Sequence, residues 1–339
     1  MSPWKLLPKV ELHLHLEGSV WPQDVRELAR RNHLPSAELP AKAFARQFQY
    51  SDFPGFLLAF KSVTEHLCQP RDYAWVAGRL MDRLGAQSVI YAEIFISGGV
   101  ILKQRKPLDE IVEAVCEVTR TDGPGKGTEV NWILDITRQF GRKLAEEVVD
   151  AAIRLRAAGL DNLVGVGMGG DENSIEANEF KHALGRAREA GLRITIHAGE
   201  VAGPNSIWEA LDILKAERIG HGLAARQDER LMRHLAEKSI LLECALTSNV
   251  KTGALQRIED HPLKHFLRSG LAVSLNTDDP ALFSTDLEKE YDLAETALGF
   301  TREDFVSMNR SALEHSFTSP GSRASLLELF ERRLSSPQL

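Results

Sequence analysis

The chain has 339 residues, 43% of them hydrophobic and 26% charged, and its 48 acidic side chains against 41 lysines and arginines give a net charge of −7 at pH 7. This composition supports a large core and excludes general disorder, and the mild acidity argues against nucleic acid or a membrane surface as a partner. The cysteines form no CxxC pair and no run approaches about 18 apolar residues, so we expect a cytoplasmic protein without disulfides or a membrane span.

Short apolar segments recur along the chain and predict β-strands. Between most of them lie helical patterns, as at residues 109–115, 144–155 and 180–190. This alternation predicts an α/β fold with a parallel sheet, and eight strands fit a closed (β/α)8 TIM-type barrel better than an open doubly wound sheet. The strands are expected at residues 10–15, 89–95, 130–136, 163–168, 192–197, 218–221, 240–244 and 271–277.

The interval between the first two strands, about residues 18–87, is too long for one crossover helix. It contains helical patterns at residues 22–31 and 73–84, with an aromatic segment at residues 44–60 between them. We interpret it as a helical insertion at the mouth of the barrel; packing on the barrel flank is an equally good alternative. No linker divides the chain, so we expect one domain over residues 1–339. Closing helices are expected at residues 287–298, 302–315 and 322–333.

Side chains that can bind a metal stand at the carboxyl ends of several predicted strands. His13 and His15 end the first strand and, two residues apart, point the same way. His197 and His221 end the fifth and sixth strands, and Asp278 follows the eighth. A lone histidine is usually structural, but barrel enzymes build their sites at this end of the barrel. Imidazoles with a carboxylate favour a divalent metal, zinc first.

A metal site of this kind predicts hydrolytic chemistry. Zinc lowers the pKa of a bound water to about 7, and attack on an sp² carbon also needs a base and an acid. Glu200 can reach the cavity without competing for the metal, and His221 can contact the water. Asp278 can bind the metal while Asp279 accepts from a substrate; alternatively, the Asp-Asp-Pro sequence simply starts a turn or helix. The remaining histidines are expected to be surface or packing residues: His33, His66, His182, His234, His261, His265 and His315.

Six segments, in this order and spread over nearly the whole chain, resemble the adenosine deaminases of the amidohydrolase superfamily. The combination of HAGE with HLH, GHG and TDDP is highly specific. The segments are PKVELHLHLEG at 8–18, GGDE at 169–172, HAGE at 197–200, ERIGHG at 217–222, TSNVKTGA at 247–254 and SLNTDDPALF at 274–283.

The resemblance implies a (β/α)8 barrel and a reaction on a 6-aminopurine. Glu200 would protonate N1, and His221 would orient the water that attacks C6 and help remove its proton, so that ammonia leaves. Gly170 would donate its backbone N–H to N3, and Asp279 would contact N7. The resemblance also implies one zinc ion per chain, bound by His13, His15, His197 and Asp278, the last of which joins Glu200 and His221 in the catalytic set.

The sequence departs from the family pattern where the 5′ side of a nucleoside would lie. Glu17 replaces an aspartate that binds the 5′ hydroxyl, and Phe95 replaces an arginine; both look like the adenine deaminase branch, whereas GGDE and TSNVKTGA look like the nucleoside branch. Adenosine, converted to inosine and ammonia, is therefore the default substrate. Adenine and a 5′-modified adenosine such as aminodeoxyfutalosine, of the bacterial menaquinone route, are alternatives. The carboxylate of the latter would need a cation such as Arg138 or Arg46, unless both are solvated surface groups.

Two other classes of protein stay open. Another metal hydrolase of the superfamily would cleave an amide, lactone or phosphoester, but such enzymes commonly add a carboxylated lysine and a second metal, and no predicted strand ends in lysine. A catalytically inactive binding relative is disfavoured because the set of site residues is complete. The HxE and PCxxC signature of the Cys/His zinc deaminases is missing. The expected partner is a small purine nucleoside, without nucleic acid or membrane.

Overall fold

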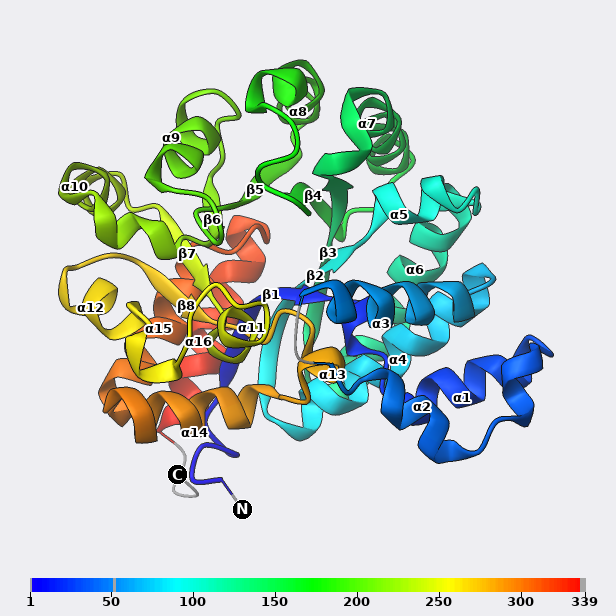
Figure 1. Cartoon of the computed structure of the whole chain (residues 1–339). Coiled ribbons are helices and arrows are strands. Elements are labelled where there is room, and N and C mark those ends of the chain that lie inside the picture. The colour runs from blue at the N-terminus through cyan, green and yellow to red at the C-terminus, as the bar shows by residue number, and fades with distance from the viewer. Residues whose placement is uncertain (1, 51–52, 336–339) are drawn as a thin grey trace.

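The computed structural model describes residues 2–50 and 53–335, and within them eight parallel strands form one sheet in the order β1 to β8 (Figure 1). The sheet closes because the His15 N–H donates to the Asp278 carbonyl at 2.8 Å and the Asp278 N–H donates to the His13 carbonyl at 3.0 Å. This confirms the predicted α/β fold with a (β/α)8 TIM-type barrel. The strands are β1 (Lys9–His15), β2 (Val89–Ile96), β3 (Glu129–Thr137), β4 (Leu163–Gly169), β5 (Arg193–Ala198), β6 (Arg218–His221), β7 (Leu241–Cys244) and β8 (Val273–Leu275).

The strands are short and largely apolar because helices cover the outside of the barrel and side chains fill its inside. Every residue of β1 and β2 is buried. Strand β8 is shorter than the expected 271–277. The Thr277 N–H donates to the Glu11 side chain on β1, at Oε1 and 2.8 Å, instead of to a backbone carbonyl, and Asp278 has a φ of +63°, which ends the extended conformation.

An irregularity in β1 changes which side chains share its inner face. The register passes from Glu11 opposite Ala92 to Leu14 opposite Ile94, so β1 has one residue more than β2 in this interval. Strict alternation would put Glu11 on the face of the two histidines. Glu11 instead pairs with Thr277 and lines a separate cavity of about 420 Å³.

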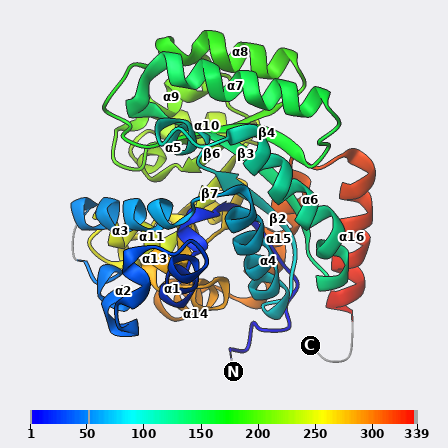
Figure 2. The ribbon, with the colours of Figure 1, turned by 90° about the vertical axis from the view of Figure 1, so that its right-hand side faces the viewer.

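Helices alternate with the strands around the barrel, and Figure 2 shows α3, α11 and α13 at one end of it and α16 at the other. The α-helices are α1 (Pro22–Arg31), α2 (Ala41–Gln47), α3 (Phe53–His66), α4 (Pro70–Ala86), α5 (Gly98–Lys103), α6 (Leu108–Lys126), α7 (Gly141–Ala157), α8 (Lys181–Glu189), α9 (Pro204–Asp212), α10 (Glu229–Glu237), α11 (Leu246–Lys251), α12 (Leu263–Arg268), α13 (Pro280–Phe283), α14 (Leu287–Leu298), α15 (Arg302–Glu314) and α16 (Pro320–Leu334).

The long interval after β1 contains two kinds of helix. Helix α4 packs against β2 and α6, as a crossover helix does, so α1 to α3 are what this chain adds between β1 and its crossover. Helix α3 contributes side chains to the pocket at the carboxyl ends of the strands. Residues 51–52 of the expected aromatic segment, and residues 1 and 336–339 of the expected domain, lie outside the described residues.

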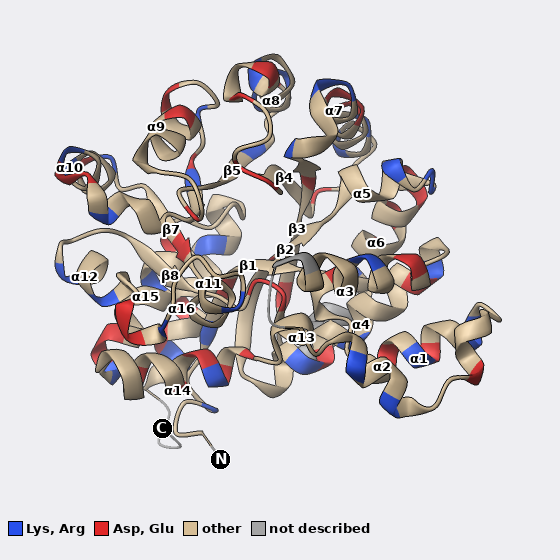
Figure 3. Cartoon of the chain, in the orientation of Figure 1, with Lys and Arg blue, Asp and Glu red and all other residues tan. Residues whose placement is uncertain are grey.

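The outer helices carry charges of both signs, interleaved along their exposed faces (Figure 3). Cys68, Cys116 and Cys244 are free thiols. None of the helices in residues 2–50 and 53–335 is both long and apolar enough to cross a membrane.

Candidate active site

Four predicted site residues meet at the carboxyl end of the barrel. One ligand-type atom from each of His13, His197, His221 and Asp278 lies within 4.8 Å of the other three, and all four side chains are buried. Asp278 Oδ1 is 3.6 Å from His13 Nε2, and Asp278 Oδ2 is 4.0 Å from His221 Nε2. The group comes from the ends of β1, β5 and β6 and from the turn after β8, so strands distant in sequence build it together.

His15 joins this group through the aspartate. Its Nε2 atom is 3.4 Å from Asp278 Oδ1, and its ring stacks on Phe95 with a centroid distance of 4.9 Å. His13 and His15 thus both face the aspartate, as their spacing predicted. His15 is nevertheless not one of the four whose ligand atoms all lie within 4.8 Å of one another.

The hydrogen bonds of two histidines prepare them to bind a metal. His13 Nδ1 is 2.7 Å from Glu243 Oε2, and His197 Nδ1 is 3.1 Å from the Met168 carbonyl. Carboxylate and carbonyl oxygens only accept, so Nδ1 carries a proton in both rings, and in the neutral form of each ring Nε2 keeps its lone pair. Burial acts to lower the pKa of His13, but the carboxylates of Asp278 and Glu243 outweigh it and raise that pKa to about 10, so a metal ion would have to displace a proton from Nε2 of His13. His13 Nε2 is buried without a hydrogen-bond partner. Two such nitrogens beside a carboxylate fit a borderline divalent cation such as zinc.

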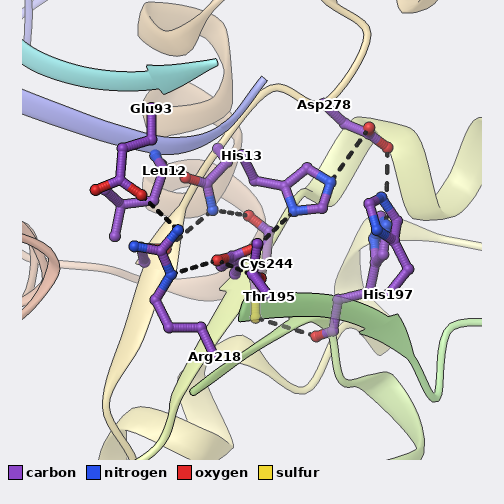
Figure 4. Close-up of polar contacts among 12 residues, drawn as sticks. Leu12, His13, Glu93, Thr195, His197, Arg218, Cys244 and Asp278 are labelled. Carbon is purple, nitrogen blue, oxygen red and sulfur yellow. Dashed lines mark hydrogen bonds and ion pairs between the residues drawn. The ribbon is translucent and has the colours of Figure 1, made fainter. Parts of the chain in front are cut away.

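A buried ion network supports His13 from behind (Figure 4). Glu243 accepts from Arg218 Nε at 2.6 Å and from Thr195 Oγ1 at 2.9 Å, and Arg218 Nη2 lies 2.6 Å from Glu93 Oε2. Burial acts to raise the pKa of Glu243, but Arg218 and His13 outweigh it and lower that pKa, so Glu243 stays ionised. Sequence reasoning missed this network, although a charged residue inside each of three apolar strands was the available signal.

Glu200 lies beside His221, and its carboxyl group has a raised pKa, as a proton donor requires. Its Oε1 accepts from Thr252 Oγ1 at 3.2 Å, and its Oε2 is 3.6 Å from His221 Nε2. Burial, aided by the charges of Asp278 and Glu172, raises the pKa of Glu200 to about 8. The carboxyl group is therefore mostly protonated at neutral pH and can give up a proton.

Glu172, the last residue of GGDE, holds the loop that carries Glu200. Its carboxylate accepts backbone N–H groups from Gly199 at 3.1 Å, Glu200 at 2.9 Å and Ala202 at 3.1 Å. Gly199 has a φ of +69°, which a glycine adopts without strain. Within GGDE, a role in the site was predicted from the sequence only for Gly170. The contacts of Glu172 become visible only in the folded loop.

The TSNVKTGA segment forms the short helix α11 and its end, which lie over the cluster. Ser248 Oγ donates to Asp278 Oδ2 at 2.6 Å, and Asn249 Nδ2 lies 3.0 Å from His221 Nδ1. With Thr252 on Glu200, one helical segment thus contacts three predicted catalytic groups. The motif was recognised in the sequence, but no role was predicted for Ser248, Asn249 or Thr252.

The cluster lies in a pocket with a cavity of about 620 Å³, whose described lining includes the predicted residues His15, Gly170, His197, Glu200, His221, Asp278 and Asp279. Gly170 has a φ of +94°, which favours glycine, and a Cβ there would also have to displace the end of the Gln139 side chain. Apolar lining comes mainly from Phe56, Leu57 and Phe60 of α3 and from Phe140 and Phe283, and Lys61 and Lys103 also line the pocket.

Two buried aspartates line the pocket with unpaired oxygens. Oδ1 of Asp279 and Oδ1 of Asp135 are buried without a hydrogen-bond partner, and burial raises the pKa of both carboxyl groups. Asp279 precedes α13, which begins at Pro280, so the turn interpretation and the pocket interpretation both hold. Asp135, at the end of β3, was not predicted; as an acidic residue near a strand end it matched the signal used for the others.

The residues expected at the 5′ side do not gather at the pocket. Glu17 is buried, accepts the Ser97 N–H at 3.1 Å, and is not among the described residues that line the pocket. Arg138 is also buried and donates to the Ile175 carbonyl at 3.3 Å, and Arg46 is exposed on α2; neither belongs to the described lining. Phe95 lies under His15.

Comparison with known proteins gives one family. Residues 8–332 match the family model described as adenosine deaminase. The chain is 38% identical over 322 residues to aminodeoxyfutalosine deaminase of Streptomyces avermitilis (94% of this chain, 88% of that protein), and 35% identical over 328 residues to adenosine deaminase of Edwardsiella ictaluri (93% and 95%). It superposes on the crystal structure of adenine deaminase from Arthrobacter aurescens with a TM-score of 0.90 and 28% identity, covering 97% of this chain and 100% of that one.

Proposed function

The chain belongs to the adenosine deaminase family, and on that premise we propose that it hydrolyses the 6-amino group of a purine nucleoside, with adenosine to inosine and ammonia as the default reaction. The observation that carries this proposal is the juxtaposition, in one pocket, of a buried histidine and aspartate cluster with a carboxyl group whose pKa is raised to about 8. Deamination at C6 needs both parts, because a nucleophile must form while the ring nitrogen gains a proton.

We propose that the cluster holds one zinc ion per chain through His13, His15, His197 and Asp278. The Nδ1–H bonds to Glu243 and Met168, which leave Nε2 of His13 and His197 free, support this donor set. A bound zinc ion supplies a water whose pKa is lowered to about 7. Elemental analysis giving close to one zinc per chain is expected; two metals per chain would favour another metal hydrolase.

The chain's own residues then perform the proton transfers. Glu200, protonated at neutral pH, gives its proton to N1 of the purine, which makes C6 electrophilic. His221 and Asp278 orient the attacking water, and Asp279 and the Gly170 N–H hold N7 and N3. The pocket position of each of these groups supports this assignment.

A second candidate substrate is a 5′-modified adenosine whose extension is aromatic and ends in a carboxylate, as in aminodeoxyfutalosine. The observation that favours it is the part of the lining that combines the phenylalanines of α3 with two lysines. Lys103 lies 5.5 Å from the Phe140 ring, and Lys61 is 3.7 Å from Glu65 on the same helix. These lysines take the place that Arg138 and Arg46 held in the sequence-based expectation.

The deciding experiment is a substrate panel with zinc-loaded protein. Adenosine, adenine, aminodeoxyfutalosine and 5′-methylthioadenosine are compared by kcat/KM, followed through the loss of the 6-aminopurine chromophore, with Glu200→Gln as the inactive control. Turnover of a nucleoside supports the proposal. Turnover of adenine alone would overturn the nucleoside assignment, and no turnover of any compound would overturn the deaminase. We further propose a cytoplasmic location, which the free thiols support and cell fractionation tests.

A further inference from the structure

A chain of buried hydrogen bonds runs from a backbone amide to His221. The Leu263 N–H donates to His261 Nδ1 at 3.1 Å, His261 Nε2 lies 3.1 Å from Asn249 Oδ1, and Asn249 Nδ2 lies 3.0 Å from His221 Nδ1. His261, Asn249 and His221 are all buried. His261 was expected to be a surface or packing residue; the fold instead places it one side chain away from the site.

The first bond of this chain sets the direction of all the others. A backbone N–H can only donate, so His261 Nδ1 must accept and the ring proton must be on Nε2. That proton fixes the Asn249 amide with its oxygen toward His261 and its NH₂ group toward His221. Burial lowers the pKa of His261 to about 3, which keeps this ring neutral. His221 Nδ1 therefore accepts, and the proton of neutral His221 is on Nε2.

This tautomer separates His221 from the other histidines of the cluster. His13 and His197 donate through Nδ1, so in their neutral forms Nε2 is the atom left to bind a metal. His221 presents an N–H at Nε2, 3.6 Å from Glu200 Oε2 and 4.0 Å from Asp278 Oδ2. A nitrogen that carries hydrogen cannot bind a metal and cannot accept a proton from water.

We propose that Asn249 and His261 are positioning residues that hold His221 in its Nε2–H tautomer, so that His221 orients the attacking water as a hydrogen-bond donor and is neither a metal ligand nor the base. This inference rests on the proposed function. It assigns roles to two residues outside the expected site and leaves His15, 3.4 Å from Asp278, as the further nitrogen donor to the metal.

The direct test locates the ring proton of His221. In zinc-loaded protein with ¹⁵N-labelled histidine, a long-range ¹H–¹⁵N correlation shows which ring nitrogen carries hydrogen, and the signal is assigned by its loss in His221→Gln. Wild-type protein is expected to show hydrogen on Nε2. Hydrogen on Nδ1 overturns the proposal, whether or not any aminopurine is turned over, so this readout is independent of the proposed function.

Asn249→Asp keeps the shape of the side chain but replaces the donor to His221 with an acceptor. Because Asn249 Nδ2 also lies 3.5 Å from Glu200 Oε1, the His221 signal, and not kcat alone, is the deciding readout. The His221 signal is expected to move to the Nδ1–H pattern, with kcat about 10- to 100-fold lower, KM within about 3-fold and zinc content unchanged. Asn205→Asp, which adds the same charge at an exposed position of α9, is the matched control and should behave as wild type. An unchanged His221 signal in folded Asn249→Asp overturns the proposal, whatever the value of kcat.

Two variants of His261 test the proposal independently, in case Asn249→Asp does not fold. His261→Gln can still donate to Asn249 Oδ1 and is expected to keep the wild-type His221 signal and most of kcat. His261→Leu cannot donate to Asn249 Oδ1, so this variant is expected to lose the wild-type His221 signal and most of kcat. Equal His221 signals and equal kcat in the two variants would show that His261 is only a packing residue.

Discussion

The carboxylate of Glu172 accepts the backbone N–H of Glu200 at 2.9 Å, so the GGDE segment holds the residue that is proposed to protonate the substrate. The two carboxyl groups also interact through their charges, since Glu172 contributes to the raised pKa of Glu200. The same residue thus sets the position of the acid and part of its proton affinity.

Glu172→Gln is therefore expected to change activity in two ways. The amide has one accepting oxygen in place of two, which loosens the loop, and kcat should fall about 10-fold. Loss of the negative charge should lower the pKa of Glu200, so the alkaline decline of kcat/KM should begin at a lower pH than in wild type. The pH dependence of kcat/KM, measured for both proteins, tests this expectation. If kcat is lower but the alkaline decline of kcat/KM begins at the same pH as in wild type, Glu172 positions the loop without changing the pKa of Glu200.

Glu200→Gln should keep the metal and lose most turnover. The amide can occupy the same space but cannot transfer a proton, so kcat is expected to fall at least about 100-fold with zinc content unchanged. In wild type, the acid form is the active one and the pKa is raised to about 8, so kcat/KM should decline as pH rises through that value. Unchanged kcat in the variant would show that Glu200 is not the proton donor.

Glu243→Gln should weaken metal binding without removing it. The neutral amide still accepts from His13 Nδ1 but loses the charge that Arg218 stabilises, so metal affinity should fall about 10- to 100-fold in competition with a chelator. His13→Ala, which removes the ligand itself, should lose the metal and the activity together. Equal affinities of Glu243→Gln and wild type would contradict the supporting role.

Glu11→Gln tests the buried carboxyl group beside the site. Burial raises the pKa of Glu11 from 4.5 to about 7, so between these values the folded protein holds a proton that the unfolded chain has released, and stability falls as pH rises. Glutamine can still accept the Thr277 N–H. The variant should remove up to about 3 kcal/mol of this pH dependence, measured as the urea midpoint at pH 5 and pH 8. Equal pH dependence of the two proteins would contradict the shift.

Lys61→Met and Lys103→Met test the second candidate substrate. Both lysines are exposed at the pocket, so each should contribute little, and KM for a substrate with a 5′ carboxylate should rise about 2- to 5-fold for each variant. Adenosine, which has no charge there, serves as the control and should show no change. Equal effects on both substrates would show that the lysines do not bind the carboxylate.

The site could be predicted as far as strand ends allow. His13, His15, His197 and His221 stand at the ends of predicted strands, and Asp278 follows one. Because the carboxyl ends of all the strands of a barrel face one side, sequence position alone brings these residues together. Glu17 shows what strand-end position does not decide: it comes two residues after His15, and only the folded turn after β1 shows that its carboxylate accepts the N–H of Ser97, a residue that lines the pocket.

The sequence by itself determined the barrel, the composition of the cluster and the chemistry that such a cluster favours, because strand–helix alternation and strand-end position are local properties. Only the tertiary structure decided which nitrogen each histidine presents. That choice depends on partners far away in sequence: Glu243 for His13, Met168 for His197, and the bonds through Asn249 and His261 for His221. A histidine offers two nitrogens of nearly equal basicity, so the hydrogen bonds of its folded surroundings select the tautomer.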